Sequence, residues 1–153
     1  MQPVAGGGGL ATGVSTLAKL HTGDAVCADT LRLHIRAASD AVADQSAKLR
    51  VRDAVLACLD AACPAGNQTD ARSWAARNLF TLQLAARHAL ARCGVNAPVQ
   101  VQLVNMYFPA RQYTGGCLPA GRYDAVRITI GSGSGQNWWC VLYPGLCRAA
   151  CGG

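Results

Sequence analysis

The residues best suited to chemistry gather near the C-terminal end of the chain, between Gly131 and Cys147. Cys140 is a potential nucleophile, and His34, far away in the sequence, is a base with which it could pair in space. The sequence offers no evident third group to orient such a histidine. A Cys/His hydrolase is therefore one alternative, and a non-catalytic protein, with no catalytic residue, is the interpretation we favour.

The other cysteines and histidines do not suggest a metal site. The chain has three histidines and eight cysteines, namely Cys27, Cys58, Cys63, Cys93, Cys117, Cys140, Cys147 and Cys151. No Cys-x2-Cys pair occurs, so the spacing typical of zinc ligands is missing and we expect neither metal nor cofactor. Pro144-Gly145 can turn the chain back, which predicts a Cys140–Cys147 disulfide in an oxidising compartment. A Cys147–Cys151 bridge and two reduced cysteines remain alternatives.

Alternating glycines precede the last predicted strand. Gly131, Gly133 and Gly135 predict a loop with little side-chain restraint. The run lacks the Gly-Lys-Ser/Thr ending of a phosphate-binding loop and leads into a strand, so no helix N-terminus would meet a phosphate. We therefore exclude a phosphate-binding loop.

Two adjacent tryptophans follow this loop. Successive residues of a strand point to opposite faces, so Trp138 and Trp139 are predicted to pack on different surfaces. With Tyr123 and nearby basic strands they could form a nucleic-acid platform, which needs aromatic and basic side chains interleaved on one face. The interleaving is loose here, and we expect no nucleic-acid partner and no small-molecule substrate.

Length and composition indicate one folded domain. The chain has 153 residues, 51% of them hydrophobic and 14% charged, which excludes a wholly disordered chain. The net charge of +6 suits an acidic partner or serves solubility alone. Residues 1–28 are rich in Gly, Ala and Thr and are predicted to be a flexible leader or the remnant of an export signal. We expect a domain over residues 29–148 and a tail over 149–153.

The hydrophobic periodicity predicts strands and helices in the order β-α-α-β-β-β. The predicted strands cover residues 31–37, 99–103, 126–130 and 138–143, and the predicted helices cover 41–62 and 69–92. A loop is expected over residues 108–121. This order predicts an α+β fold of two layers, in which two long helices pack on one face of a mostly antiparallel sheet.

Basic residues alternate with apolar ones in the first predicted strand. The basic side should then form a polar sheet face that nothing in the chain covers, and this face is either solvated or a docking surface. We interpret it as a docking surface and expect charge reversal at Arg32 and Arg127 to impair docking while leaving the fold intact. The predicted partner-binding residues are Arg32, His34, Arg36, Arg127, Asn137, Trp138 and Trp139.

Several segments together resemble the stage II sporulation protein R family. The matching segments cover about residues 30–147 and are Leu31 to Ile35, Ser39-Asp40, Asp44-Gln45, Lys48-Leu49, Val51 to Val55, Phe108-Pro109, Leu118 to Ala125, Arg127-Ile128 and Gly131 to Cys147. The most specific of them is Asn137-Trp138-Trp139-Cys140-Val141-Leu142 with the following Pro144 and Cys147. Ala38 departs from the family, which has asparagine at that position.

This resemblance implies a signalling protein of endospore-forming bacteria. Members are secreted by the forespore into the space between forespore and mother-cell membranes, although residues 1–26 here do not look like the family's hydrophobic export signal. There they activate the sigma-E factor processing peptidase, a membrane-embedded aspartic peptidase that cleaves pro-sigma-E. The alternative from another class is a secreted Cys/His hydrolase of the cell envelope.

Overall fold

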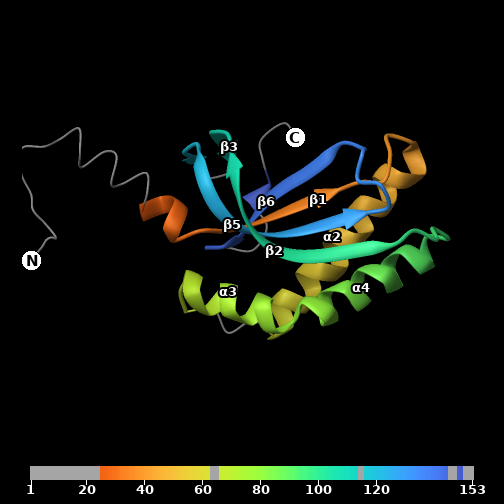
Figure 1. Cartoon of the computed structure of the whole chain (residues 1–153), viewed down its shortest axis with the longest axis horizontal. Helices are drawn as coiled ribbons and strands as arrows, with labels where there is room; N and C mark the ends of the chain where they lie inside the picture. The colour runs from red at the N-terminus through yellow and green to blue at the C-terminus, as the bar shows by residue number, and fades with distance from the viewer. Residues whose placement is uncertain (1–24, 63–65, 114–115, 145–147, 150–153) are drawn as a thin grey trace, which may run out of the picture.

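Helices cover one face of a five-stranded sheet in the computed structural model (Figure 1), which describes residues 25–62, 66–113, 116–144 and 148–149. The helices are α2 (Val42–Ala62), α3 (Gln68–Arg77) and α4 (Leu79–Arg92), and the sheet strands are β1 (Leu31–Arg36), β2 (Val99–Phe108), β5 (Gly121–Ile130), β6 (Asn137–Tyr143) and β7 (Arg148–Ala149). The short strands β3 (Arg111–Tyr113) and β4 (Gly116–Leu118) pair with each other. The predicted two-layer α+β fold is confirmed, and the predicted element order fits apart from an additional helix and the short strands β3, β4 and β7.

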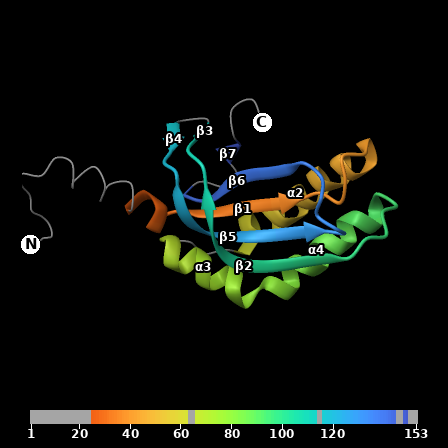
Figure 2. The ribbon, with the colours of Figure 1, turned by 45° about the horizontal axis from the view of Figure 1, so that its top comes forward.

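The sheet is mixed, with β1 at its centre. The strand order is β2-β5-β1-β6-β7, as Figure 2 shows, and β1 runs parallel to β5 and antiparallel to β6. The pairs β2–β5 and β6–β7 are antiparallel. Because β1 has a neighbour on each side and side chains packed over both faces, its residues Leu31 to Ile35 are all buried.

The main core lies between the sheet and the helices. Leu33 and Ile35 of β1 point into it and meet Val51 and Val55 of α2, and all four side chains are fully buried. The apolar spacing of α2 therefore places one stripe of that helix against the sheet, as its periodicity predicts.

The second predicted helix is in fact two helices, and the prediction of one long helix was wrong on this point. Asn78 separates α3 from α4, and its side-chain amide donates a hydrogen bond of 2.7 Å to the Trp74 carbonyl. Its backbone N–H bonds to Ala75 instead of residue 74. Asparagine competes in this way for backbone groups, which interrupts the helical ladder.

The predicted loop over residues 108–121 is more regular than expected. Strands β2 and β5 pair along ten residues each, up to Phe108 opposite Gly121, and β3 and β4 form a hairpin between them. A helical turn over residues 25–28 precedes β1, so part of the segment predicted as a leader is ordered.

A second, smaller core lies on the sheet face away from the helices. Phe108, Tyr123 and Ala125 are fully buried there, and Cys27 and Trp139 pack against them. This aromatic layer covers the face that the sequence predicted to be open, so the prediction of an uncovered basic face was wrong. The covering residues come from β2, β5, β6 and the turn at 25–28, which the alternation within β1 alone could not reveal.

Candidate partner-binding groove

The glycine-serine loop before β6 is bonded firmly to the turn after β1. The hydroxyls of Ser132 and Ser134 each donate a hydrogen bond of 3.1 Å to the Ala38 carbonyl. The backbone N–H of Gly135 donates to the Ala37 carbonyl at 2.9 Å. The prediction of a loop with little restraint was therefore wrong, because neighbouring serines and backbone groups supply the restraint that glycine lacks.

Gly135 is required where these two segments touch. A Cβ atom at position 135 would lie 2.3 Å from the Ser39 carbonyl oxygen, which is closer than any real contact. The adjacent Gln136 N–H donates to the Asp40 carboxylate at 2.8 Å. The loop therefore fixes where β6 begins and how its first residues are presented.

The first residues of β6 place their aromatic rings on opposite sides of the sheet. Trp138 packs against the main core beneath α2, and the Arg52 guanidinium lies 4.5 Å from its ring centroid. Trp139 packs on the other face, 4.9 Å from the Phe108 ring in an edge-to-face contact. The prediction that the two tryptophans serve different surfaces is confirmed.

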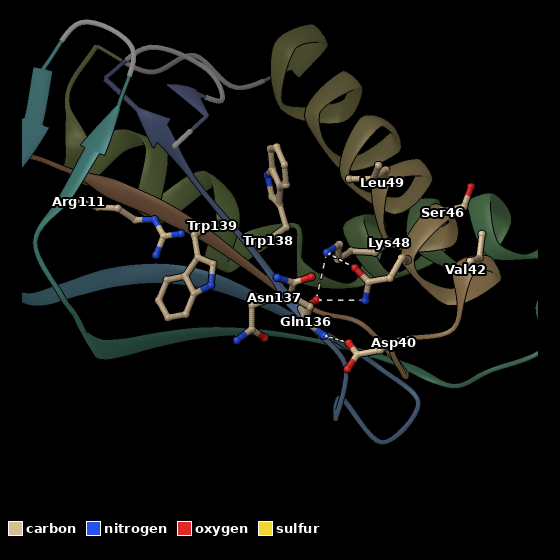
Figure 3. Close-up of a pocket in the computed structure, with 11 residues that line it drawn as sticks. Asp40, Val42, Ser46, Lys48, Leu49, Arg111, Gln136, Asn137, Trp138 and Trp139 are labelled. Carbon is tan, nitrogen blue, oxygen red and sulfur yellow. Dashed lines mark hydrogen bonds between the residues drawn. The ribbon is translucent and has the colours of Figure 1, made fainter. Parts of the chain in front are cut away.

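A cavity of about 700 Å³ lies around this end of β6. Figure 3 shows Trp138 directed toward α2 and Trp139 directed the other way, near Arg111 of β3. The lining residues are Asp40, Val42, Gln45, Ser46, Lys48, Leu49, Arg111, Gln136, Asn137, Trp138 and Trp139, and we call this cavity the tryptophan groove. It is a concave surface of mixed apolar and cationic character, which is typical of a binding site.

Lys48 is a buried cation in the wall of the groove. Its side chain is 5% exposed, and its ammonium donates hydrogen bonds to the Gln45 side-chain oxygen at 2.7 Å and to the Gln136 carbonyl at 3.1 Å. Burial lowers the pKa of Lys48; nearby Asp40 opposes this shift and Arg52 adds to it. Both bonded acceptors are neutral, so the charge is only partly compensated.

The charge of the groove is positive. Lys48 and Arg111 are its cationic lining residues, and Asp40 is its acidic one. The Asp40 carboxylate, which accepts the hydrogen bond from Gln136, offsets part of this charge, so two cations against one carboxylate leave a small positive excess. Such a surface favours a partner that brings carboxylates.

Two of the predicted partner-binding residues are buried, so their prediction as surface contacts was wrong. Arg32 is 0% exposed, and its guanidinium lies 4.1 Å from the Phe108 ring centroid and 4.6 Å from that of Tyr123. His34 is 5% exposed and stacks 4.6 Å from the Trp139 ring. Aromatic faces attract a cation, which offsets part of the cost of burying Arg32.

The electrostatics of His34 reflect its burial. Burial lowers the pKa of His34 to about 4, the adjacent Asn137 side chain opposes this shift, and the charges of Arg127 and Arg36 add to it. Its ring nitrogens are buried and make no hydrogen bond of good geometry within the described residues. His34 is therefore neutral at physiological pH, while Arg36 and Arg127 are half-buried and Asn137 is exposed.

The geometry contradicts the Cys140–His34 pair. His34 pairs across the strands with Trp139 and shares its face, whereas Cys140 is opposite Leu33 and packs in the main core. The sheet itself separates the two side chains. Cys140 is fully buried, and Cys147, its predicted disulfide partner, lies outside the described residues.

The described residues offer little support for binding of nucleic acid, binding of a metal ion or a membrane-spanning helix. Tyr123 is fully buried and cannot stack on a nucleic-acid base. Within residues 25–62, 66–113, 116–144 and 148–149, no three His, Cys, Asp or Glu side chains gather as metal ligands would. No helix in this described part of the chain combines the length and apolar character needed to cross a bilayer.

Comparison with known proteins identifies the family. The model of the stage II sporulation protein R family matches residues 27–152. The chain belongs to this family. The stage II sporulation protein R of Bacillus subtilis (strain 168) is 36% identical over 118 residues, which are 76% of this chain and 53% of that protein. The chain thus spans about half the length of this curated relative, and no solved structure matches it.

Most of the groove is built from the segments by which the chain resembles the stage II sporulation protein R family. Of the lining residues, Asp40, Gln45, Lys48, Leu49, Gln136, Asn137, Trp138 and Trp139 lie in those segments. The sequence analysis missed Lys48 as a site residue, although a lysine inside the matching Lys48-Leu49 pair was visible. It also missed Arg111, whose approach depends on the β3–β4 hairpin and left no local signal.

Proposed function

We propose that this stage II sporulation protein R family member is an extracytoplasmic signalling protein that activates the sigma-E factor processing peptidase. Family membership places the chain in sporulation. The family resemblance implies the peptidase as the partner. Its activation by this chain goes beyond family membership and is our proposal.

The observation that carries this proposal is the tryptophan groove. It is open, partly apolar and cationic, and it lies at the Asn137-Trp138-Trp139 segment that is most specific to the family resemblance. Asn137, Trp138 and Trp139 remain partner contacts in this proposal, joined by Arg111, and the buried Lys48 adds its charge from within the groove wall. The buried Arg32 and His34 make no partner contact in this proposal, and His34 packs against the Trp139 ring.

Activation by a binding protein needs a difference in affinity between two states of the peptidase. A ligand shifts an equilibrium only by as much as it prefers one state, so this chain must bind the active form more tightly. In this proposal the chain acts by binding alone and catalyses no reaction.

Co-expression in a non-sporulating host tests the proposal. The chain, directed outside the cytoplasm by an added export signal, is produced with the peptidase and pro-sigma-E, and cleavage of pro-sigma-E is followed by immunoblot. We expect cleavage with all three components, and none without the chain or with the peptidase's catalytic aspartate replaced. Cleavage that does not depend on the chain would contradict the proposal.

A further inference from the structure

We infer that the tryptophan groove receives an extended acidic segment of a protein partner, which adds as a strand to the edge of β6 at residues 137–139. This inference depends on the proposed function only for the name of the partner. The binding mode itself is argued from the groove.

Among the described residues, none pairs with the outer edge of β6 at its beginning. On one side, β6 pairs with β1 along its length, from Asn137 opposite Arg36 onward. On the other side, β7 pairs with Cys140 and Val141, and within the described part of the chain no strand pairs there with residues 137–139. In an antiparallel ladder alternate residues direct their N–H and C=O groups to opposite neighbours, so this edge presents backbone donors and acceptors.

The groove follows this edge. Trp138 and Trp139 point to opposite faces of the sheet, yet both line the same cavity, together with α2 on one side and Arg111 on the other. The cavity therefore passes from one face of the sheet to the other around the beginning of β6. A strand laid along β6 would place alternate side chains against the two tryptophans in turn, as in other cases of strand addition.

The charges of the groove select an acidic occupant. Lys48 uses two of its three ammonium protons on neutral acceptors and makes no ion pair within the described residues. Arg111 lies over the other tryptophan, 5.8 Å from the Trp139 ring centroid. A carboxylate of the added strand would therefore meet the Arg111 guanidinium on one face and the charge of the buried Lys48 on the other, and a basic segment would be repelled.

Selection from a random twelve-residue peptide library on the purified 153-residue chain tests this inference. We expect enriched peptides in which acidic residues alternate with apolar ones. Hydrogen exchange with such a peptide should slow at those amides of residues 137–139 that point away from β1. The Arg111→Glu change should weaken binding about tenfold or more, because it replaces a charge-assisted contact with repulsion. The matched Arg87→Glu change, at an exposed arginine of another cavity on α4, should leave affinity unchanged.

Three results would overturn the inference. Enriched peptides without acidic residues would reject the charge argument, and binding without protection of residues 137–139 would reject strand addition. A concentration-dependent dimer that protects these amides without peptide would assign the groove to a second copy. Circular dichroism verifies that Arg111→Glu is folded, and Arg111→Gln replaces it if it is not. Since these measurements contain no peptidase, failure of the co-expression assay would leave their outcome unchanged.

Discussion

Arg32 is the largest fully buried side chain in the described part of the protein. Its guanidinium contacts the Phe108 and Tyr123 rings, so the positive charge is held by aromatic faces beneath the sheet. The electron-rich faces that favour a cation would repel an anion. Arg32 is thus part of the architecture, and its charge serves the fold.

We predict that Arg32→Glu destabilises the protein by about 3–5 kcal/mol, because it buries an uncompensated charge. The free energy of unfolding is measured by urea titration with circular dichroism. Arg50→Glu, at an exposed position of α2, is the control and should change stability by about 0.5 kcal/mol or less. Equal stability of the two variants would show that Arg32 is not held as the structure describes.

His34 gives stability a dependence on pH. Its pKa is about 4 in the folded state, whereas the ordinary histidine pKa of 6.5 applies in the unfolded chain. Between these values the unfolded chain binds the proton and the folded state does not. The contribution of neutral His34 is therefore complete above about pH 6.5 and is lost as the pH falls toward 4.

The difference between the folded and unfolded pKa values of His34 corresponds to about 3 kcal/mol of folding stability. We predict that the free energy of unfolding falls between pH 7 and pH 4, and that His34→Gln removes that part of the fall. Urea titrations of both proteins at several pH values provide the measurement. An identical pH dependence in the two proteins would mean that His34 titrates normally.

At the scale of the elements, the junction between the glycine-serine loop and the turn after β1 determines the start of β6. Gly135 lies so close to Ser39 that a side chain at position 135 would displace the backbone of Ser39. The bonds from Ser132 and Ser134 to Ala38 lie in the same junction. Displacement of the loop would therefore shift Trp138 and Trp139 in the groove.

We predict that Gly135→Ala costs about 1–3 kcal/mol of stability, as overpacking does, and weakens peptide binding in the groove. Gly66→Ala is the control, since a Cβ there would meet only the flexible Asp70 carboxylate at 3.4 Å. Thermal unfolding and hydrogen exchange at residues 131–136 are the measurements. Unchanged protection and stability in Gly135→Ala would contradict the proposed junction.

Local sequence patterns do not predict two features of the elements, the break between α3 and α4 and the β3–β4 hairpin. The apolar periodicity continues smoothly from α3 into α4, and the break depends on one amide, Asn78, that bonds to the Trp74 carbonyl. The β3–β4 hairpin was predicted as loop because its two strands are three residues each and Gly-rich or polar. Short strands of this kind gain their stability from neighbours that a local window does not contain.

For the whole molecule, hydrophobic periodicity was sufficient to predict the two layers and the order of the elements. It also predicted that Trp138 and Trp139 separate to different faces. It could not predict that β5 would insert beside β1, or that Phe108 and Tyr123 would cover Arg32, because these contacts join segments distant in sequence. The candidate site therefore moved from the basic face to one end of β6.

We propose that the tryptophan groove is the surface through which this chain activates the peptidase. The most direct measurement is cleavage of pro-sigma-E in the co-expression host with Arg111→Glu and with Arg87→Glu, both verified as folded and exported. We predict that Arg87→Glu supports cleavage at the unmodified level and that Arg111→Glu reduces it about tenfold or more. Equal cleavage with the two variants would contradict the claim.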